Sequence, residues 1–194
     1  MDYKRYLDIQ LGGGLIKPVH YHIGEWLAMK ILNTGWHENA EILDVGCGIG
    51  YGVGMFNKLG FDNVLGIDVN LEKIELGRGL GYNIIYKDIL GFDDFGDRFD
   101  IIWCSHSFEH MLYPDKVLDT LLRFSNDDVR FYFILPYPDL NPAPAHCAVK
   151  EIGTNIDDGG DTVVKWFEDR GLKNIFRAFS TFREPEIWLE FTKK

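Results

Sequence analysis

Short apolar segments alternate with segments of helical periodicity between residues 41 and about 135, and this alternation restricts the fold more than any other feature. Short apolar runs are typical of strands buried on both faces, as in a parallel sheet. Parallel strands are joined by crossover helices, in right-handed βαβ units. The expected strands span residues 41–45, 63–67, 83–87, 99–104 and 129–135, and the expected helices span 51–59, 71–80 and 114–124.

The flanking regions extend this pattern. Residues 22–32 carry apolar side chains at helical spacing and predict a leading helix. A later helix is expected over 162–170, because Gly171 suits the position just after a helix. Strands are expected over 174–180 and 186–192, and the short Pro-containing link between them favours an antiparallel pair. In open parallel α/β sheets ligands bind beyond the carboxyl ends of the strands, so functional residues are expected there.

The composition is that of one ordinary globular domain, with 194 residues, of which 46 % are hydrophobic and 26 % charged. The formal net charge is −10. This balance argues against nucleic acid and anionic membrane partners, because basic surfaces recognise both. Three separated cysteines without a Cys-x-x-Cys pair disfavour a disulfide framework and a zinc ribbon. With neither an apolar signal segment nor a membrane-spanning run, the chain is expected to be cytoplasmic.

The first expected strand ends in a glycine-rich loop, with three alternating glycines within residues 44–50 (DVGCGIG). Glycine lets the backbone approach a ligand closely, and the N–H groups there favour an anionic group, either a pyrophosphate or a carboxylate. A dinucleotide-binding loop needs Gly-x-Gly-x-x-Gly/Ala. Its third position falls here on Tyr51 or Val53, depending on the glycine from which one counts. Binding of NAD or a flavin is therefore disfavoured.

The loop resembles the first motif of the class I S-adenosylmethionine (SAM)-dependent methyltransferases, an acidic residue followed by x-Gly-x-Gly-x-Gly, which Asp44 to Gly50 match. The resemblance continues from about residue 22 to the end of the chain. It implies a doubly wound α/β fold with a mostly parallel seven-stranded sheet, helices on both faces and an antiparallel last strand. One methyltransferase domain is expected over residues 1–194, with a leading helical segment, residues 1–35, over the cofactor and substrate site.

Three further signals of the family follow in order. Asp68 ends the second expected strand, Asp88 follows the third, and residues 104–110 (CSHSFEH) follow the fourth. The last stretch is similar to the family's Leu-Glu-His segment, with Phe108 in place of Leu.

The resemblance implies a role for each of these positions around SAM. The backbone of residues 46–50 would face the methionine part, with Asp44 near its amino group, often through water. Asp68 would accept both ribose hydroxyls, and Asp88 would accept the adenine amino group, with apolar residues on either side of the ring. The expected cofactor-binding residues are Asp44, Gly46, Cys47, Gly48, Gly50, Asp68, Val69, Asp88, Ile89 and Ser105.

Structural interpretations of the same residues stay open. The glycine loop could be a plain tight turn, and the role of Asp68 or Asp88 could be limited to capping a helix or starting a turn.

The segment after the fourth expected strand also matches a zinc-peptidase motif, His106-x-x-Glu109-His110. In that motif both histidines lie on a helix and bind zinc together with a distant third ligand. Here the segment follows a buried strand and already matches the methyltransferase pattern. We therefore expect no metal site, and His110 is predicted to be packed or hydrogen-bonded at a helix start.

The candidate catalytic residue is His146, just after the proline-rich stretch 136–144. Loops beyond the fifth strand and leading helices often shape the substrate pocket in this family, and an imidazole titrates near neutrality, as a general base requires. His20 and His22 are further candidates, and an ordinary loop histidine remains the alternative for all three. Four tryptophans are expected in the core rather than in the site: Trp26, Trp103, Trp166 and Trp188.

The expected function is transfer of a methyl group from SAM to a small-molecule acceptor by in-line displacement. The chain lacks the Asp/Asn-Pro-Pro-aromatic motif of DNA amino methylation, the Pro-Cys pair of cytosine C5 methylation and the paired-Glu loop of arginine methylation. A SAM-binding protein without turnover and an NAD-dependent oxidoreductase are the alternatives. The acceptor, the methylated atom and the oligomeric state are left open.

Overall fold

The computed structural model describes residues 35–36, 39–91, 98–140, 144–181 and 185–194. The predicted leading helix over 22–32 lies outside these residues, as do His20, His22 and Trp26. Within the described part, no helix combines the length and the apolar character that crossing a bilayer requires.

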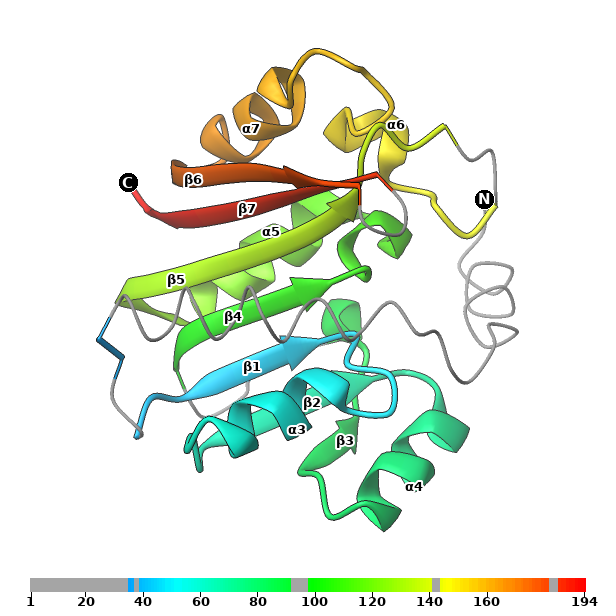
Figure 1. The fold of residues 1–194 in the computed structure, drawn as a ribbon, viewed down its shortest axis with the longest axis vertical. Helices are drawn as coiled ribbons and strands as arrows, with labels where there is room; N and C mark the ends of the chain where they lie inside the picture. The colour runs from blue at the N-terminus through cyan, green and yellow to red at the C-terminus, as the bar shows by residue number, and fades with distance from the viewer. Residues whose placement is uncertain (1–34, 37–38, 92–97, 141–143, 182–184) are drawn as a thin grey trace.

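The described strands form one seven-stranded sheet in the order β3-β2-β1-β4-β5-β7-β6 (Figure 1). Neighbouring strands from β3 to β5 are parallel, and β7 runs antiparallel to both of its neighbours, β5 and β6. This confirms the doubly wound, mostly parallel sheet with an antiparallel last strand. The strands are β1 Ile42–Val45, β2 Val64–Asp68, β3 Ile84–Tyr86, β4 Phe99–Ser105, β5 Ser125–Pro136, β6 Leu172–Ser180 and β7 Glu186–Lys193.

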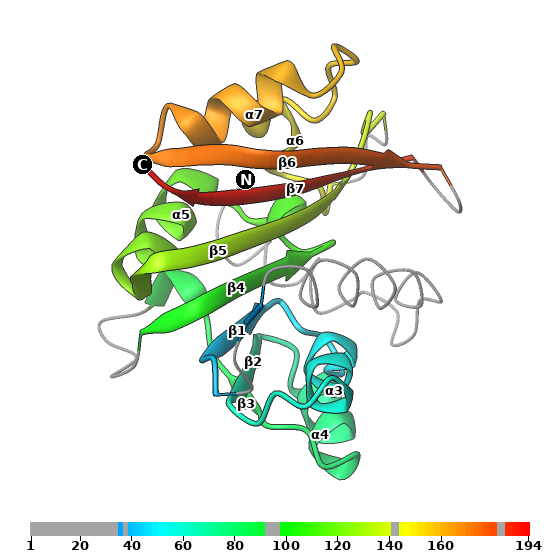
Figure 2. The same cartoon turned by 60° about the vertical axis from the view of Figure 1, so that its left-hand side comes forward.

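Helices cover both faces of the sheet, as the alternation predicted, and each face has its own core. In Figure 1, α3 lies in front of the sheet and α5 behind it, and Figure 2 gives a second view of the two layers. Phe56 and Trp103 belong to the core on the α3 and α4 side, whereas Phe133 and Phe167 belong to the core on the α5 and α7 side. The helices are α3 Tyr51–Lys58, α4 Leu71–Gly79, α5 Pro114–Arg123, α6 Val149–Ile152 and α7 Asp161–Glu168.

The described tryptophans agree with a core role. Trp103 and Trp166 are buried, and Trp188 is half-buried against the α3-side core. Large aromatic rings supply much of the apolar area that a core of this size buries.

Some boundaries differ from those that the sequence predicts. β5 begins at Ser125 rather than at residue 129, although the residues that follow Ser125 are polar. Ser125 pairs with Phe99 of β4, and the Ser125 hydroxyl donates to the Leu122 carbonyl. Helix α6 was not predicted, since four residues are too few to show a helical period. Two 3₁₀ turns, η1 Ile89–Gly91 and η2 Phe108–His110, were also not predicted.

The topology places the ends of β1, β2 and β4 together. β1 lies between β2 and β4, and its register pairs Asp44 with Gly66 on one side and with Trp103 on the other. Strand order reverses direction at this point of the sheet, and ligands of open α/β sheets bind beyond the carboxyl ends of strands at such a point. The segments that follow these strands therefore form the candidate site.

Candidate active site

The glycine-rich loop after β1 is tied to the end of β2. The N–H groups of Gly46 and Cys47 both donate to the Ile67 carbonyl, at 2.9 and 3.0 Å. Gly46 has a φ of 69°, a conformation that glycine adopts without strain. A Cβ built on it would lie 2.5 Å from the Cβ of Ser107, so only glycine lets the loop approach the segment after β4 this closely.

Asp44 is a buried carboxyl on β1, with 3 % of its surface exposed. Burial raises its pKa to about 7, the negative charge of Asp68 adds to the shift, and a hydrogen bond from the Val53 backbone opposes it. Gly52, in the first turn of α3, packs directly on this carboxyl: a Cβ built on Gly52 would lie 2.4 Å from Asp44 Oδ2. A cation that reached Asp44 would favour its ionised form.

Asp68 ends β2, and two backbone N–H groups fix its carboxylate. Gly48 donates to Oδ2 and Asn70 donates to Oδ1, each at 2.8 Å. The Gly48 N–H was expected to face the ligand, but here it links the first loop to the second strand. Each carboxylate oxygen can accept more than one hydrogen bond, so this arrangement still suits a pair of hydroxyl groups. The side chain of Asn70 caps α4, accepting from the Lys73 N–H at 3.2 Å.

Asp88 and Ile89 lie at the start of the turn η1, after β3. Asp88 Oδ1 accepts from the Leu90 N–H at 2.9 Å, which is the turn-starting role that the sequence left open. Ile89 is only 6 % exposed and packs into the α5-side core, whereas Val69 is half-buried. Of the two apolar residues expected beside an adenine ring, Val69 is the more exposed.

The other expected cofactor-binding residues are Cys47 and Gly50, in the loop after β1, and Ser105, at the end of β4. Cys47 is buried against Gly66, and burial raises the pKa of its thiol well above the usual value, so it is a packed thiol rather than a reactive one. Gly50 begins α3 and sits against Tyr82 and Ile84. At the end of β4, the hydroxyl oxygen of Ser105 is buried and has no hydrogen-bond partner among the described residues.

A group of histidines and acids follows β4, within and beside the segment that resembles Leu-Glu-His. His106 has a φ of 48°, and its Nε2 lies 3.0 Å from Oε2 of Glu186 at the start of β7. Glu109, in η2, is 1 % exposed. Its Oε1 lies 3.8 Å from His106 Nδ1 and 3.8 Å from His110 Nε2. His110 lies in a 3₁₀ turn rather than in an α-helix, and it is hydrogen-bonded, as predicted.

His146, the predicted catalytic residue, joins this group from the loop after β5. Its Nδ1 lies 2.5 Å from Oδ2 of the buried Asp139. Its ring packs edge to face on that of His110, with 4.8 Å between the ring centroids. No motif in the sequence points to Asp139 or Glu186 as a histidine partner, because each contact forms only when distant parts of the chain fold together.

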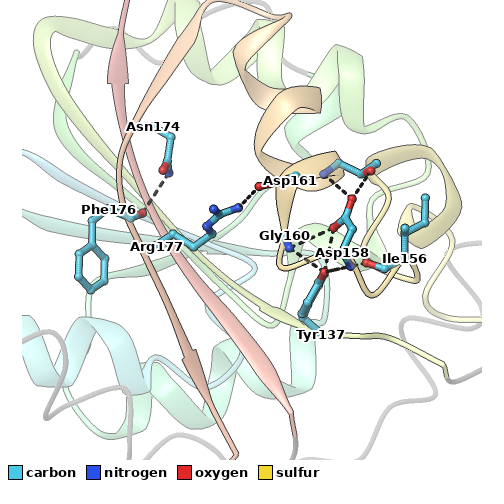
Figure 3. Close-up of polar contacts among 9 residues, drawn as sticks. Tyr137, Ile156, Asp158, Gly160, Asp161, Asn174, Phe176 and Arg177 are labelled. Atoms are coloured by element: carbon cyan, nitrogen blue, oxygen red, sulfur yellow. Dashed lines mark hydrogen bonds and ion pairs between the residues drawn. The ribbon is translucent and has the colours of Figure 1, made fainter.

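The Tyr137 hydroxyl binds the backbone of residues 156–160 (Figure 3). At the end of β5, its hydroxyl donates to the Ile156 carbonyl at 2.7 Å and accepts from the N–H groups of Asp158 and Gly160 at 2.9 and 2.7 Å. Asp139, two residues further on, donates its N–H to the Thr154 carbonyl. These bonds fix the path of the backbone that presents Asp139 to His146.

A family model described as a methyltransferase domain matches residues 25–180 of the chain. The match includes the glycine-rich loop, both strand-ending acids and the histidine group. Among curated protein sequences, none matches this chain.

Solved structures with the same fold include several methyltransferases. PH0226 protein from Pyrococcus horikoshii OT3 matches with a TM-score of 0.70 and 16 % identity over 100 % of both chains. Magnesium protoporphyrin IX methyltransferase from Synechocystis PCC 6803, with bound S-adenosylhomocysteine (SAH), matches with a TM-score of 0.68 and 15 % identity, covering 98 % of this chain and 94 % of that one. The [4+2]-cyclase SpnF matches with a TM-score of 0.65 and 15 % identity, covering 88 % and 81 %. At these identities the likeness shows the fold alone.

Proposed function

Because the chain belongs to the methyltransferase-domain family, whose cofactor is SAM, we propose that it transfers the methyl group of SAM to a small-molecule acceptor. The observation that carries the proposal is the arrangement of Asp44 and Asp68. One is a buried carboxyl whose pKa lies near 7, and the other is an oriented carboxylate, joined to the first loop through Gly48.

The residues present suit the chemistry of SAM. The ammonium group of SAM is cationic, and a cation beside the buried Asp44 would lower the pKa of this carboxyl and favour its ionised form at neutral pH. The ribose carries two neighbouring hydroxyl donors, and Asp68 presents two carboxylate oxygens already oriented by backbone N–H groups. At Gly48 a Cβ would meet only Cδ of Lys73, at 4.0 Å, so the backbone is open to a ligand there.

We assign the remaining cofactor contacts to the residues that the resemblance named. Asp88 would accept the adenine amino group, and Val69 would lie against the ring. Ser105 would offer its buried hydroxyl to the methionine end. Gly46 and Gly50 act through the path of the loop, within which Cys47 packs against Gly66, and Ile89 is buried at the start of η1.

When bound, SAM supplies an electrophilic methyl group on a sulfonium, and the protein has to hold the acceptor in line with the departing sulfur. Positioning of reactants can lower a barrier by about 7–11 kcal/mol in favourable cases. The histidine group after β4 and β5 stands at the same edge of the sheet and is the candidate acceptor side.

His146 is our candidate for contact with the acceptor. Its ring is oriented by Asp139 through Nδ1, which directs Nε2 toward other partners. An imidazole held in this way can take a proton from an acceptor hydroxyl. It can equally ligate a metal ion through Nε2. The two roles use the same atom and exclude one another.

The further expectations stay predictions: one domain over residues 1–194, a cytoplasmic location, and an acceptor other than nucleic acid. The net charge of −10 supports the last of these.

Calorimetric titration of the full chain with SAM and with SAH tests the cofactor half of the proposal. We expect both to bind, and a thermal-shift comparison should show stabilisation by SAM but not by NAD. Binding of neither SAM nor SAH would overturn the proposal. Incubation with radiolabelled SAM and a panel of small hydroxyl and amine acceptors tests turnover. Tight SAM binding without transfer to any acceptor would favour a SAM-binding protein without turnover.

A further inference from the structure

Glu109, His110 and His146 bring one carboxylate and two imidazoles together at the carboxyl end of the sheet. One ligand atom from each residue lies within 4.8 Å of the other two. We propose that these three residues form a binding site for one divalent transition-metal cation, of which Zn²⁺ is the simplest probe. The site differs from the zinc-peptidase pattern in the sequence, because it pairs His110 with His146 rather than with His106.

The first support comes from Glu109, which is 1 % exposed. Its Oε2 atom is buried and has no hydrogen-bond partner among the described residues. A buried carboxylate oxygen without a partner is costly, because desolvation is not compensated. A cation bound by the Glu109 carboxylate would compensate the buried negative charge that this group carries when ionised. The expectation that the chain binds no metal did not take this burial into account, since burial is not visible in the sequence.

The second support is the way in which both histidines are held. His110 Nδ1 lies 3.0 Å from the Ala145 carbonyl, and His146 Nδ1 lies 2.5 Å from Asp139 Oδ2. A carbonyl and a carboxylate accept hydrogen bonds, so each places the proton on Nδ1. Metal-bound histidines are held in this manner almost without exception, since the outer hydrogen bond fixes the tautomer and directs Nε2 at the metal.

The distances require a small adjustment on binding. Ligand atoms about 2.1 Å from one tetrahedral Zn²⁺ lie about 3.4 Å apart. The Glu109 Oε1 to His110 Nε2 distance is 3.8 Å, close to that value, and the full set spans up to 4.8 Å. The most distant ligand atoms must therefore approach each other by up to about 1.4 Å on binding. His146 sits on a loop after β5, where such a movement costs less than it would within the sheet.

The donor set selects the class of ion. Two imidazole nitrogens and one carboxylate oxygen suit Zn²⁺, Fe²⁺, Co²⁺ and related ions, whereas Mg²⁺ and Ca²⁺ prefer oxygen ligands throughout. Three protein ligands leave a coordination position for a further molecule, as in catalytic rather than structural zinc sites.

If the proposed function holds, this position gives the cation a part in it. A divalent cation beside an acceptor hydroxyl lowers the pKa of that hydroxyl. The proton would leave to solvent, the oxygen–methyl bond would form as the sulfur–methyl bond breaks, and the bonding electron pair would stay on sulfur. His146 would then serve as a ligand rather than as a general base. The binding site itself rests on the geometry alone.

The test uses the full chain, freed of metal with EDTA and dialysed, and titrated with Zn²⁺ in a calorimeter. We expect about one ion per chain, with Mg²⁺ binding far more weakly. The substitutions Glu109→Gln and His146→Gln should each weaken Zn²⁺ binding at least tenfold, while circular dichroism and SAM binding show that each variant is folded. Wild-type affinity in both folded variants, or no stoichiometric binding to the wild type, would overturn the site.

Two control variants identify the ligands. His106→Asn removes the third histidine of the group, and asparagine tolerates the positive φ at this position. Cys147→Ser removes a nearby thiol, whose Sγ donates to the His110 carbonyl at 2.9 Å. Both should retain Zn²⁺ binding within about threefold. A loss in either that exceeds the loss in Glu109→Gln would contradict the assignment. Zn²⁺ binding without SAM binding would support the metal site and refute the proposed function. SAM binding without Zn²⁺ binding would refute the metal site and leave the proposed function supported.

Discussion

The N–H of Gly48 donates to Oδ2 of Asp68 at 2.8 Å, across 20 residues of sequence. This single bond joins the glycine-rich loop after β1 to the acid that ends β2. The second oxygen of the same carboxylate accepts from Asn70, which caps α4. The glycine-rich loop and Asp68, which are separate motifs in the sequence, are thus joined by a hydrogen bond in the structure. A ligand bound to Asp68 would therefore lie beside the loop.

Asp68→Ala is expected to weaken SAM binding more than tenfold. The substitution removes the proposed charge-assisted acceptor for the ribose hydroxyls and releases the Gly48 N–H from its partner. Calorimetric titration with SAH measures the change. Asp62→Ala is the matched control, since Asp62 is an exposed acid in the loop before β2 and should leave the affinity within about twofold. Equal affinity of the Asp68 variant and the wild type would contradict the assignment of Asp68.

Gly52→Ala is expected to destabilise the protein and to weaken SAM binding. The new methyl group would stand 2.4 Å from Asp44 Oδ2, so either α3 or the carboxyl must shift, at a cost of about 1–3 kcal/mol. Urea denaturation measures the free energy of unfolding. Gly79→Ala, in the last position of α4, has open space around its Cβ and should be neutral or slightly stabilising. Similar stabilities for the two variants would show that the space beside Asp44 is not tightly closed.

The pKa of Asp44 predicts opposite pH trends for stability and for SAM binding. Its folded pKa of about 7 lies above the ordinary value of 3.8, so the folded state holds this proton more firmly than the unfolded state. The resulting stabilisation is complete below about pH 4 and is lost as the pH rises toward 7. The ammonium of SAM favours the ionised carboxyl, so SAM affinity should rise between pH 6 and pH 8.

Calorimetry at several pH values checks this prediction, with Asp44→Asn as the comparison variant. Asparagine has nearly the same shape and does not titrate, so the variant should lose both Asp44-dependent trends. In buffers of different ionisation enthalpy, the wild type should release protons on binding SAM near pH 7. A SAM affinity of the wild type that stays constant from pH 6 to pH 8 would argue against a contact between Asp44 and the ammonium group.

Tyr137→Phe is expected to destabilise the protein by about 1–3 kcal/mol, because it removes the hydroxyl that donates to the Ile156 carbonyl and accepts from the N–H groups of Asp158 and of the buried Gly160. Thermal or urea unfolding measures the loss. Tyr113→Phe is the control: this tyrosine is 41 % exposed, and its hydroxyl should contribute less than about 0.5 kcal/mol. The same small effect in both variants would mean that solvent replaces the Tyr137 hydroxyl.

The local signals in the sequence predicted most of the fold. The apolar strands and Gly171 after α7 each act through neighbours a few residues away, so their effects can be read along the chain. The structure has the seven predicted strands in one sheet and a helix at each described position where one was predicted. The sequence did not predict the polar start of β5 or the short helix α6. Contacts with other elements stabilise these segments, and their own sequences show no strand or helix periodicity.

By itself, the sequence determined the elements, the glycine-rich loop and the acids at or next to the ends of β1 and β2, because strand ends in a parallel sheet fall on one edge whatever the details of packing. Only the tertiary structure decided what those residues touch. It placed Gly52 on the Asp44 carboxyl and Asp139 on His146, and it buried Glu109 beside two histidines. Burial and long-range proximity arise when separate elements pack together, and they set the charge and hydrogen-bonding of a side chain more strongly than its neighbours in sequence do.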